Sequence, residues 1–202
     1  MPLIDVEGLL QRQLSLVEEW HKSERVPENS DSFYQLVYEQ HRTNFKLWHE
    51  EDNARDPDAS DNLIATVKRS IDRLNQKRND EIEKIDEGLL KKLDQYSVKI
   101  LEDATLNSET PGSMIDRLSI SALKIYHMDE ETRREEASKE HQENCNNKLM
   151  ILREQRQDLG RCLMEFLEDL ISGRKTLKVY RQMKMYNDSS LNPVLYQKQS
   201  TS

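Results

Sequence analysis

The feature that most constrains this chain is an apolar stripe along residues 64–89 that one arginine interrupts. Wound at about 100° per residue, the stripe gathers seven apolar side chains on one face: Ile64, Val67, Ile71, Leu74, Ile82, Ile85 and Leu89. Arg78 lies in its middle, where a leucine would be expected. A guanidinium on a packing face needs an ionic partner and hydrogen bonds, because leaving it unpaired costs about 3–5 kcal/mol. The pattern predicts one long helix that carries an internal polar cluster.

The rest of the chain also has the composition and periodicity of helices. Gly and Pro together contribute only ten residues, and 34% charged against 35% hydrophobic residues suits helices with a narrow buried stripe. Helices are predicted over residues 3–24, 32–55, 61–100 and 111–128, followed by a helix with a coiled-coil-like heptad seam over 145–170 and a short basic helix over 174–186. We expect the stretch 129–143 to be a solvated extension or a poorly packed arm.

These elements predict an all-α fold, an elongated antiparallel bundle of five to six helices. We expect one helical domain over 1–202, with an N-terminal helix in 1–30, a bundle core over 31–186 and an extended C-terminal tail over 187–202 that docks through its apolar residues. The tetrapeptide Ile-Asp-Arg-Leu occurs at 71–74 and at 115–118. Coincidence and a structural pseudo-repeat both remain open as its explanation.

Charge and cysteine content exclude several classes of protein. The net charge of −8 argues against general nucleic-acid or membrane-surface binding, since both favour a basic face. No apolar run reaches the roughly 18 residues of a membrane span, and the first residues lack the apolar segment of a signal peptide. Cys145 and Cys162 lie within one predicted helix, about 25 Å apart, which is too far for a disulfide. We therefore expect reduced thiols and a cytoplasmic protein.

Polar residues converge where two predicted helices face each other. The short loop 56–60 makes the helices over 32–55 and 61–100 an antiparallel pair, and both turn polar along the same stretch. We predict a pocket between these helices and the helix over 111–128. Its expected lining is His41, Asn44, Glu51, Asp52, Lys68, Asp72, Asn75, Arg78 and Asn79.

Two further residues extend this prediction. Arg181 and Lys184, in the basic segment, are expected to act as an anion clamp. If the protein is an enzyme, Glu51 or Asp72 would be the general base. Two alternatives stay open: a purely structural network that pairs Glu51 or Asp52 with Lys68, and simple solvated helix faces.

Local spacing predicts no transition-metal site. The chain has no His-Glu-x-x-His and no Cys/His cluster with zinc spacing. A di-iron helical bundle needs two Glu-x-x-His motifs, and this chain has one, Glu18-x-x-His21. Glu83-x-x-Asp86 keeps an oxygen-ligated Mg²⁺ open as an alternative cofactor.

Several ordered blocks of the sequence resemble a known family. They are WHEEDNARDP, KRSIDRLNQKRNDEIEKID, LNSETPGSMIDRLSI with the following ALKIYHM, EQRQDL and KVYRQMKMYNDSSLNPVLY. Together, over residues 30–196, they resemble a bacterial helical family known as domain of unknown function 4254.

The resemblance implies a bacterial, cytoplasmic, single-domain protein, and it favours sugar-nucleotide or sugar-phosphate ligands. It assigns no catalytic residue, so whether the protein is an enzyme stays open. Our leading hypothesis is a protein that binds or processes a phosphorylated small molecule. The rival hypothesis is a non-catalytic accessory or scaffold protein, which acts as a homodimer or with a partner protein.

Overall fold

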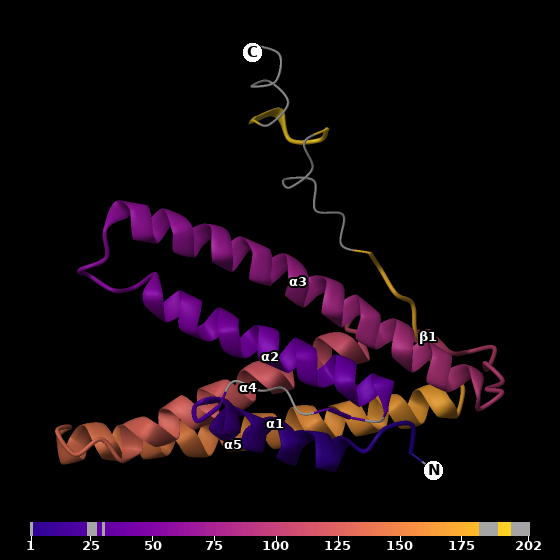
Figure 1. Ribbon diagram of the computed structural model, residues 1–202. Coiled ribbons are helices and arrows are strands. Elements are labelled where there is room, and N and C mark those ends of the chain that lie inside the picture. The colour runs from indigo at the N-terminus through magenta and orange to yellow at the C-terminus, as the bar shows by residue number, and fades with distance from the viewer. Residues whose placement is uncertain (1, 24–27, 30, 182–189, 195–202) are drawn as a thin grey trace.

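The computed structural model describes residues 2–23, 28–29, 31–181 and 190–194. These residues form five helices and two short strands (Figure 1). The helices are α1 (Val6–Trp20), α2 (Ser32–Asn53), α3 (Asp61–Asp94), α4 (Pro111–Thr132) and α5 (Lys139–Ile171), and the strands are β1 (Thr105–Leu106) and β2 (Lys175–Thr176). The prediction of an all-α fold is confirmed.

Each helix begins at a residue whose side chain accepts a hydrogen bond from the first turn. These N-caps are Asp5, Asp31, Ser60, Thr110 and Ser138. Such a cap satisfies a backbone N–H that has no partner within the helix. Pro111 follows Thr110 at the first helical position, where its missing N–H is harmless. Local sequence therefore determines where the helices start.

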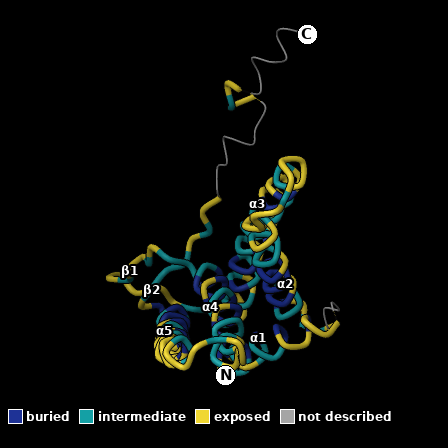
Figure 2. Tube along the Cα trace, turned by 90° about the vertical axis from the view of Figure 1, so that its left-hand side faces the viewer, coloured by how far each residue is buried: buried dark blue, intermediate teal, exposed yellow. Residues whose placement is uncertain are grey.

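The helices pack as two antiparallel pairs, and α1 packs mainly against the second pair. α2 pairs with α3, α4 pairs with α5, and α1 contacts α4, α5 and α2 (Figure 1). The largest fully buried apolar side chains are Leu9, Leu16, Ile85, Leu89, Ile115, Leu118, Leu123 and Leu163. Figure 2 shows the buried segments gathered where α1, α2, α4 and α5 meet, whereas much of α3 is half-buried or exposed. None of the described helices combines the length and apolar character needed to cross a bilayer.

The predicted basic helix over 174–186 is wrong in its described part. Lys175–Thr176 pairs in parallel with Thr105–Leu106, and no helix forms over 177–181. Gly173 has a φ of +74°, which ends α5 and turns the chain away from the helix axis. Its carbonyl then accepts a hydrogen bond from Leu101 N. Pairing with a segment about 70 residues earlier thus overrides local helix propensity; residues 182–186 lie outside the described part.

Other boundaries also differ from the expectation. α3 ends at Asp94, six residues early, and Ser97 then adopts a left-handed φ of 49°. α4 continues to Thr132, beyond its predicted end at residue 128, and α5 begins at Lys139, before its predicted start at residue 145. The expected docking of the tail is not seen at Leu191 and Val194, which are exposed.

Candidate functional site

Arg78 forms an ion pair with a residue of another helix. Its Nε donates to Asp116 Oδ1 over 2.8 Å and its terminal nitrogen donates to Oδ2, a bidentate pair between α3 and α4. Asp116 is 3% exposed and also accepts from Gln40 Nε2 (2.6 Å) and Asn44 Nδ2 (2.9 Å) of α2. The hydrogen bond to Asp116 raises the pKa of Arg78. The guanidinium on the apolar stripe is therefore fully paired.

The hydrogen bonds continue from this pair into the core. Asn44 Nδ2 also donates to Ser119 Oγ (2.9 Å), which lies 2.6 Å from His41 Nδ1, and His41 Nε2 lies 2.8 Å from the carbonyl oxygen of Gln13. Burial lowers the pKa of His41 to about 3, so the ring is neutral. Because a carbonyl only accepts, Nε2 carries the proton and Nδ1 accepts from the Ser119 hydroxyl.

Gln13 extends this series to the fifth helix. Its side-chain oxygen accepts from Arg156 of α5 (3.0 Å). We call the series Arg78–Asp116–Asn44–Ser119–His41–Gln13–Arg156 the polar chain. It contains a side chain from every helix of the described bundle.

A cavity of about 490 Å³ lies between α2, α3 and α4. It brings together five of the residues predicted for the pocket, namely Asn44, Glu51, Asp52, Asn75 and Arg78. Apolar side chains such as Trp48 and Leu123 complete its wall. Its two arginines already have carboxylate partners, Arg78 in Asp116 and Arg55 in Glu51 (3.1 Å). Their charges are thus satisfied without a ligand.

The other predicted residues lie elsewhere. His41 is fully buried in the core and does not line the cavity, and neither does Asn79. Lys68 and Asp72 form an exposed ion pair along α3, so Lys68 does not pair with Glu51 or Asp52. Arg181 is exposed and forms ion pairs with Glu83 and Glu87 of α3, and it does not line the cavity. Lys184 lies outside the described residues.

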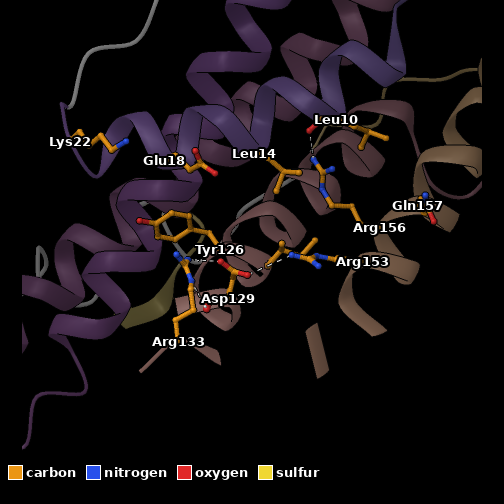
Figure 3. Close-up of a pocket in the computed structure, with 11 residues that line it drawn as sticks. Leu10, Leu14, Glu18, Lys22, Tyr126, Asp129, Arg133, Arg153, Arg156 and Gln157 are labelled. Atoms are coloured by element: carbon orange, nitrogen blue, oxygen red, sulfur yellow. Dashed lines mark hydrogen bonds and ion pairs between the residues drawn. The ribbon is translucent and has the colours of Figure 1, made fainter. Parts of the chain in front are cut away.

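A second cavity, of about 660 Å³, opens between α1, α4 and α5 (Figure 3). Its apolar and neutral lining is Leu10, Leu14, Ile125, Tyr126 and Gln157, and its charged lining is Glu18, Lys22, Asp129, Arg133, Arg153 and Arg156. Four cationic groups minus two anionic groups leave this lining with a net charge of +2. The whole chain carries −8. The lining of this cavity is therefore positively charged, whereas the chain as a whole is negatively charged.

Arg156 lies at the inner wall of this cavity. It is 6% exposed, and its guanidinium donates to three oxygens, those of Leu10 (2.9 Å), Gln13 (3.0 Å) and Leu118 (3.4 Å). All three are neutral, and within the described residues Arg156 forms no ion pair. Burial lowers the pKa of Arg156 to about 10, which keeps it charged at neutral pH. A buried charge normally has a counterion.

Two more arginines stand at the rim. Arg133 and Arg153 share a single carboxylate, Asp129, with Arg153 at 3.6 Å (Figure 3). Arg153 precedes Arg156 by one helical turn, so both project from the same face of α5. One carboxylate cannot neutralise two guanidiniums, so uncompensated positive charge remains at the entrance of the cavity as well as at Arg156 on its inner wall.

In the sequence, Arg156 falls within the heptad seam over 145–170, but no site was predicted there. The signal was the same as for Arg78, an arginine where a leucine would be expected. What was missing was the packing of α1 against α4 and α5, because no short loop links α1 to either of these helices.

One family model matches the chain, over residues 34–179, and its description is "Protein of unknown function (DUF4254)". The match spans α2 to α5 and includes both arginines of α5 that line the second cavity. No curated protein and no solved structure matches the chain.

Proposed function

The chain belongs to the DUF4254 family of proteins of unknown function, and from its own geometry we propose that it binds a phosphorylated small molecule in the cavity between α1, α4 and α5. The single observation that carries this proposal is Arg156, a buried guanidinium whose partners among the described residues are all neutral oxygens. A bound anion would supply the missing negative charge.

Phosphate suits the cavity better than other anions. A phosphate group offers several acceptor oxygens to the planar fork of an arginine. Arg156 at the wall and Arg153 at the rim approach from α5, while Lys22 and Arg133 approach from just beyond the ends of α1 and α4. This arrangement can surround a phosphate or diphosphate from several sides.

The size and wall of the cavity support a ligand larger than inorganic phosphate. Its volume of about 660 Å³ falls within the roughly 300–1,000 Å³ of small-molecule sites. Tyr126 provides an aromatic surface in the lining, on which a sugar or a base can pack. Sugar phosphates and sugar nucleotides are accordingly the first ligands to test.

The proposal concerns binding and assigns no reaction. Glu51, the candidate base that lines a cavity, belongs to the other cavity, where it is paired with Arg55. Asp72 is exposed on α3. Neither carboxylate lines the cavity around Arg156.

The test is a thermal-shift panel on the full chain with phosphate, pyrophosphate, sugar phosphates, nucleotides and sugar nucleotides. A ligand at about 100 times its dissociation constant adds roughly 2.7 kcal/mol, a rise in Tm of about 5–10 °C for a chain of this length. Arg153→Gln should abolish most of the shift. Arg161→Gln, a change at another exposed arginine of α5 that does not line the cavity, should preserve it.

Two results would contradict the proposal. One is a panel without any shift, which would favour the accessory or scaffold hypothesis and direct the work to partner capture. The other is a shift that Arg153→Gln and Arg161→Gln reduce equally, because the ligand would then respond to surface charge rather than to the cavity.

A further inference from the structure

Three of the five histidines of the chain meet at one place, although they come from three different helices. His21 follows the last residue of α1, His49 lies in α2 and His127 in α4. One ring nitrogen of each lies within 4.8 Å of those of the other two. The ring centroids are 5.2 Å apart for His21–His49, 5.3 Å for His21–His127 and 5.7 Å for His49–His127.

The rings are steeply inclined to one another, at 71–82°. Three imidazole rings that are nearly perpendicular to one another can direct their ring nitrogens towards one central point. Stacked rings could not do so. Packing holds two of them in place, since His127 stacks on Trp48 and His21 stacks on Tyr126.

Hydrogen bonds on the outer side set the protonation of two rings. His21 Nδ1 lies 2.7 Å from the carbonyl oxygen of Val17, and His127 Nδ1 lies 2.8 Å from Glu130 Oε2. Both oxygens accept, so Nδ1 carries the proton in each neutral ring and Nε2 keeps its lone pair. A metal-bound histidine usually has such a carbonyl or carboxylate behind it.

His127 supplies the observation that points to a ligand. Its Nε2 is buried and has no hydrogen-bond partner in the part of the chain that the structure describes. A buried nitrogen without a partner is unfavourable. A metal ion at the centre of the three rings would coordinate it.

From this geometry we propose that His21, His49 and His127 form a binding site for a divalent transition-metal ion, with Zn²⁺ as the ion that fits best. Imidazole nitrogens suit Zn²⁺, whereas Mg²⁺ and Ca²⁺ take oxygen ligands. Three protein nitrogens leave a fourth tetrahedral position open, as in sites where the ion also binds water or substrate. His21 is exposed, which gives the ion a route from solvent.

The required rearrangement is small. Zn–N bonds of about 2.0–2.1 Å place tetrahedral ligand nitrogens roughly 3.3 Å apart. Closing the triangle from a separation of at most 4.8 Å moves each nitrogen by less than about 1 Å. The side chains can make this movement without a shift of the helices.

The site borders the cavity around Arg156 but stands independently of it. Tyr126 lines that cavity and stacks on His21 with ring centroids 4.2 Å apart. Metal binding can therefore be measured with the ion alone, and its outcome does not depend on a phosphorylated ligand.

The test is calorimetric titration of the tag-free full chain with Zn²⁺, after chelation and dialysis, supported by the visible absorption of Co²⁺. We expect one ion per chain and a Co²⁺ spectrum of four-coordinate intensity. His49→Gln and His127→Gln should each weaken binding by at least about 100-fold. Glu130→Gln, which alters the hydrogen-bond partner behind His127 and keeps all three histidines, should weaken it about 10- to 100-fold.

The matched control is His141→Gln, which removes a histidine outside the three. His141 lies with Glu131 and Cys145 in a separate group of potential ligand atoms, so this variant also tests whether Zn²⁺ binds there instead. It should leave Zn²⁺ affinity unchanged. The proposal is overturned if the chain binds no Zn²⁺, or if His127→Gln binds it as tightly as the parent. It is also overturned if His141→Gln removes the binding. Far-UV circular dichroism checks the folding of each variant, and Glu130→Gln, at a half-exposed side chain, keeps the test open if a histidine variant unfolds.

Discussion

Replacing Asp116 by Asn should destabilise the bundle strongly, although the two side chains have nearly the same shape. Four N–H donors point at this carboxylate, two from Arg78 and one each from Gln40 and Asn44. An asparagine removes the charge and turns its own NH₂ group towards one of these donors. Removing one partner of a buried ion pair costs about 3–5 kcal/mol in the free energy of unfolding.

We expect a value near the lower end of this range. The Arg78 side chain keeps 26% of its surface exposed, so water relieves part of the loss on its side of the pair. About 3 kcal/mol corresponds to a fall in Tm of roughly 6–12 °C for a chain of this length.

A double-mutant cycle separates the pair from its surroundings. Arg78→Met leaves Asp116 buried with amide donors alone and should also destabilise. The double variant removes both charges, so its loss should be smaller than the sum of the single losses by about 2 kcal/mol. The free energies come from urea denaturation followed by far-UV circular dichroism.

The control is the exposed pair Lys68–Asp72 on the same helix. The cycle of Lys68→Met and Asp72→Asn should give a coupling below about 0.5 kcal/mol, as is usual for surface pairs. If the losses in free energy of unfolding caused by Arg78→Met and Asp116→Asn were additive to within the same limit, the ion pair would not stabilise the core and the reasoning would fail.

Three further predictions concern other parts of the bundle. The pKa of His41 is about 3 in the folded chain and 6.5 in the unfolded chain, so the unfolded chain binds more protons below pH 6.5. Lowering the pH from 8 to 5 should therefore reduce the free energy of unfolding by about 2 kcal/mol through this histidine. His41→Gln should lose this pH dependence, which urea denaturation at both pH values measures. Gly112→Ala should lower the free energy of unfolding by about 1–3 kcal/mol, measured in the same way, because the new Cβ would lie 2.7 Å from the Ile82 carbonyl oxygen. Asp129→Asn should strengthen pyrophosphate binding two- to fivefold in calorimetry, because it raises the net charge of the cavity lining to +3. Asp158→Asn, which lies outside this cavity, should have no effect. Weaker pyrophosphate binding after Asp129→Asn would argue against an anionic ligand.

The sequence was sufficient to predict the helical architecture. Caps such as Ser60 and Thr110 set where helices begin, and the apolar stripe of α3 set which face is buried. Both signals are local, so neither depends on distant parts of the chain. The segment at Lys175–Thr176 was mispredicted because its pairing partner lies about 70 residues away.

The candidate sites depended on packing that no local pattern contains. The repeated tetrapeptide at 71–74 and 115–118 illustrates this, since Asp72 is exposed on the surface while Asp116 is the buried partner of Arg78. The three histidines lie 28 and 78 residues apart along the chain, on separate helices. Motif spacing detects ligands on one helix, but not ligands that tertiary packing brings together.

The polar chain has a consequence for how precisely the helices are aligned. Leucines on facing helices can exchange neighbours when one helix slides by a turn, about 5.4 Å, because apolar contacts are not directional. The same slide would separate donors from acceptors along the polar chain and leave several buried groups unpaired at once, at about 1–3 kcal/mol each. We expect these seven side chains to select one alignment of the five helices from many that an all-leucine core would tolerate, so that the native protein populates a single packing arrangement.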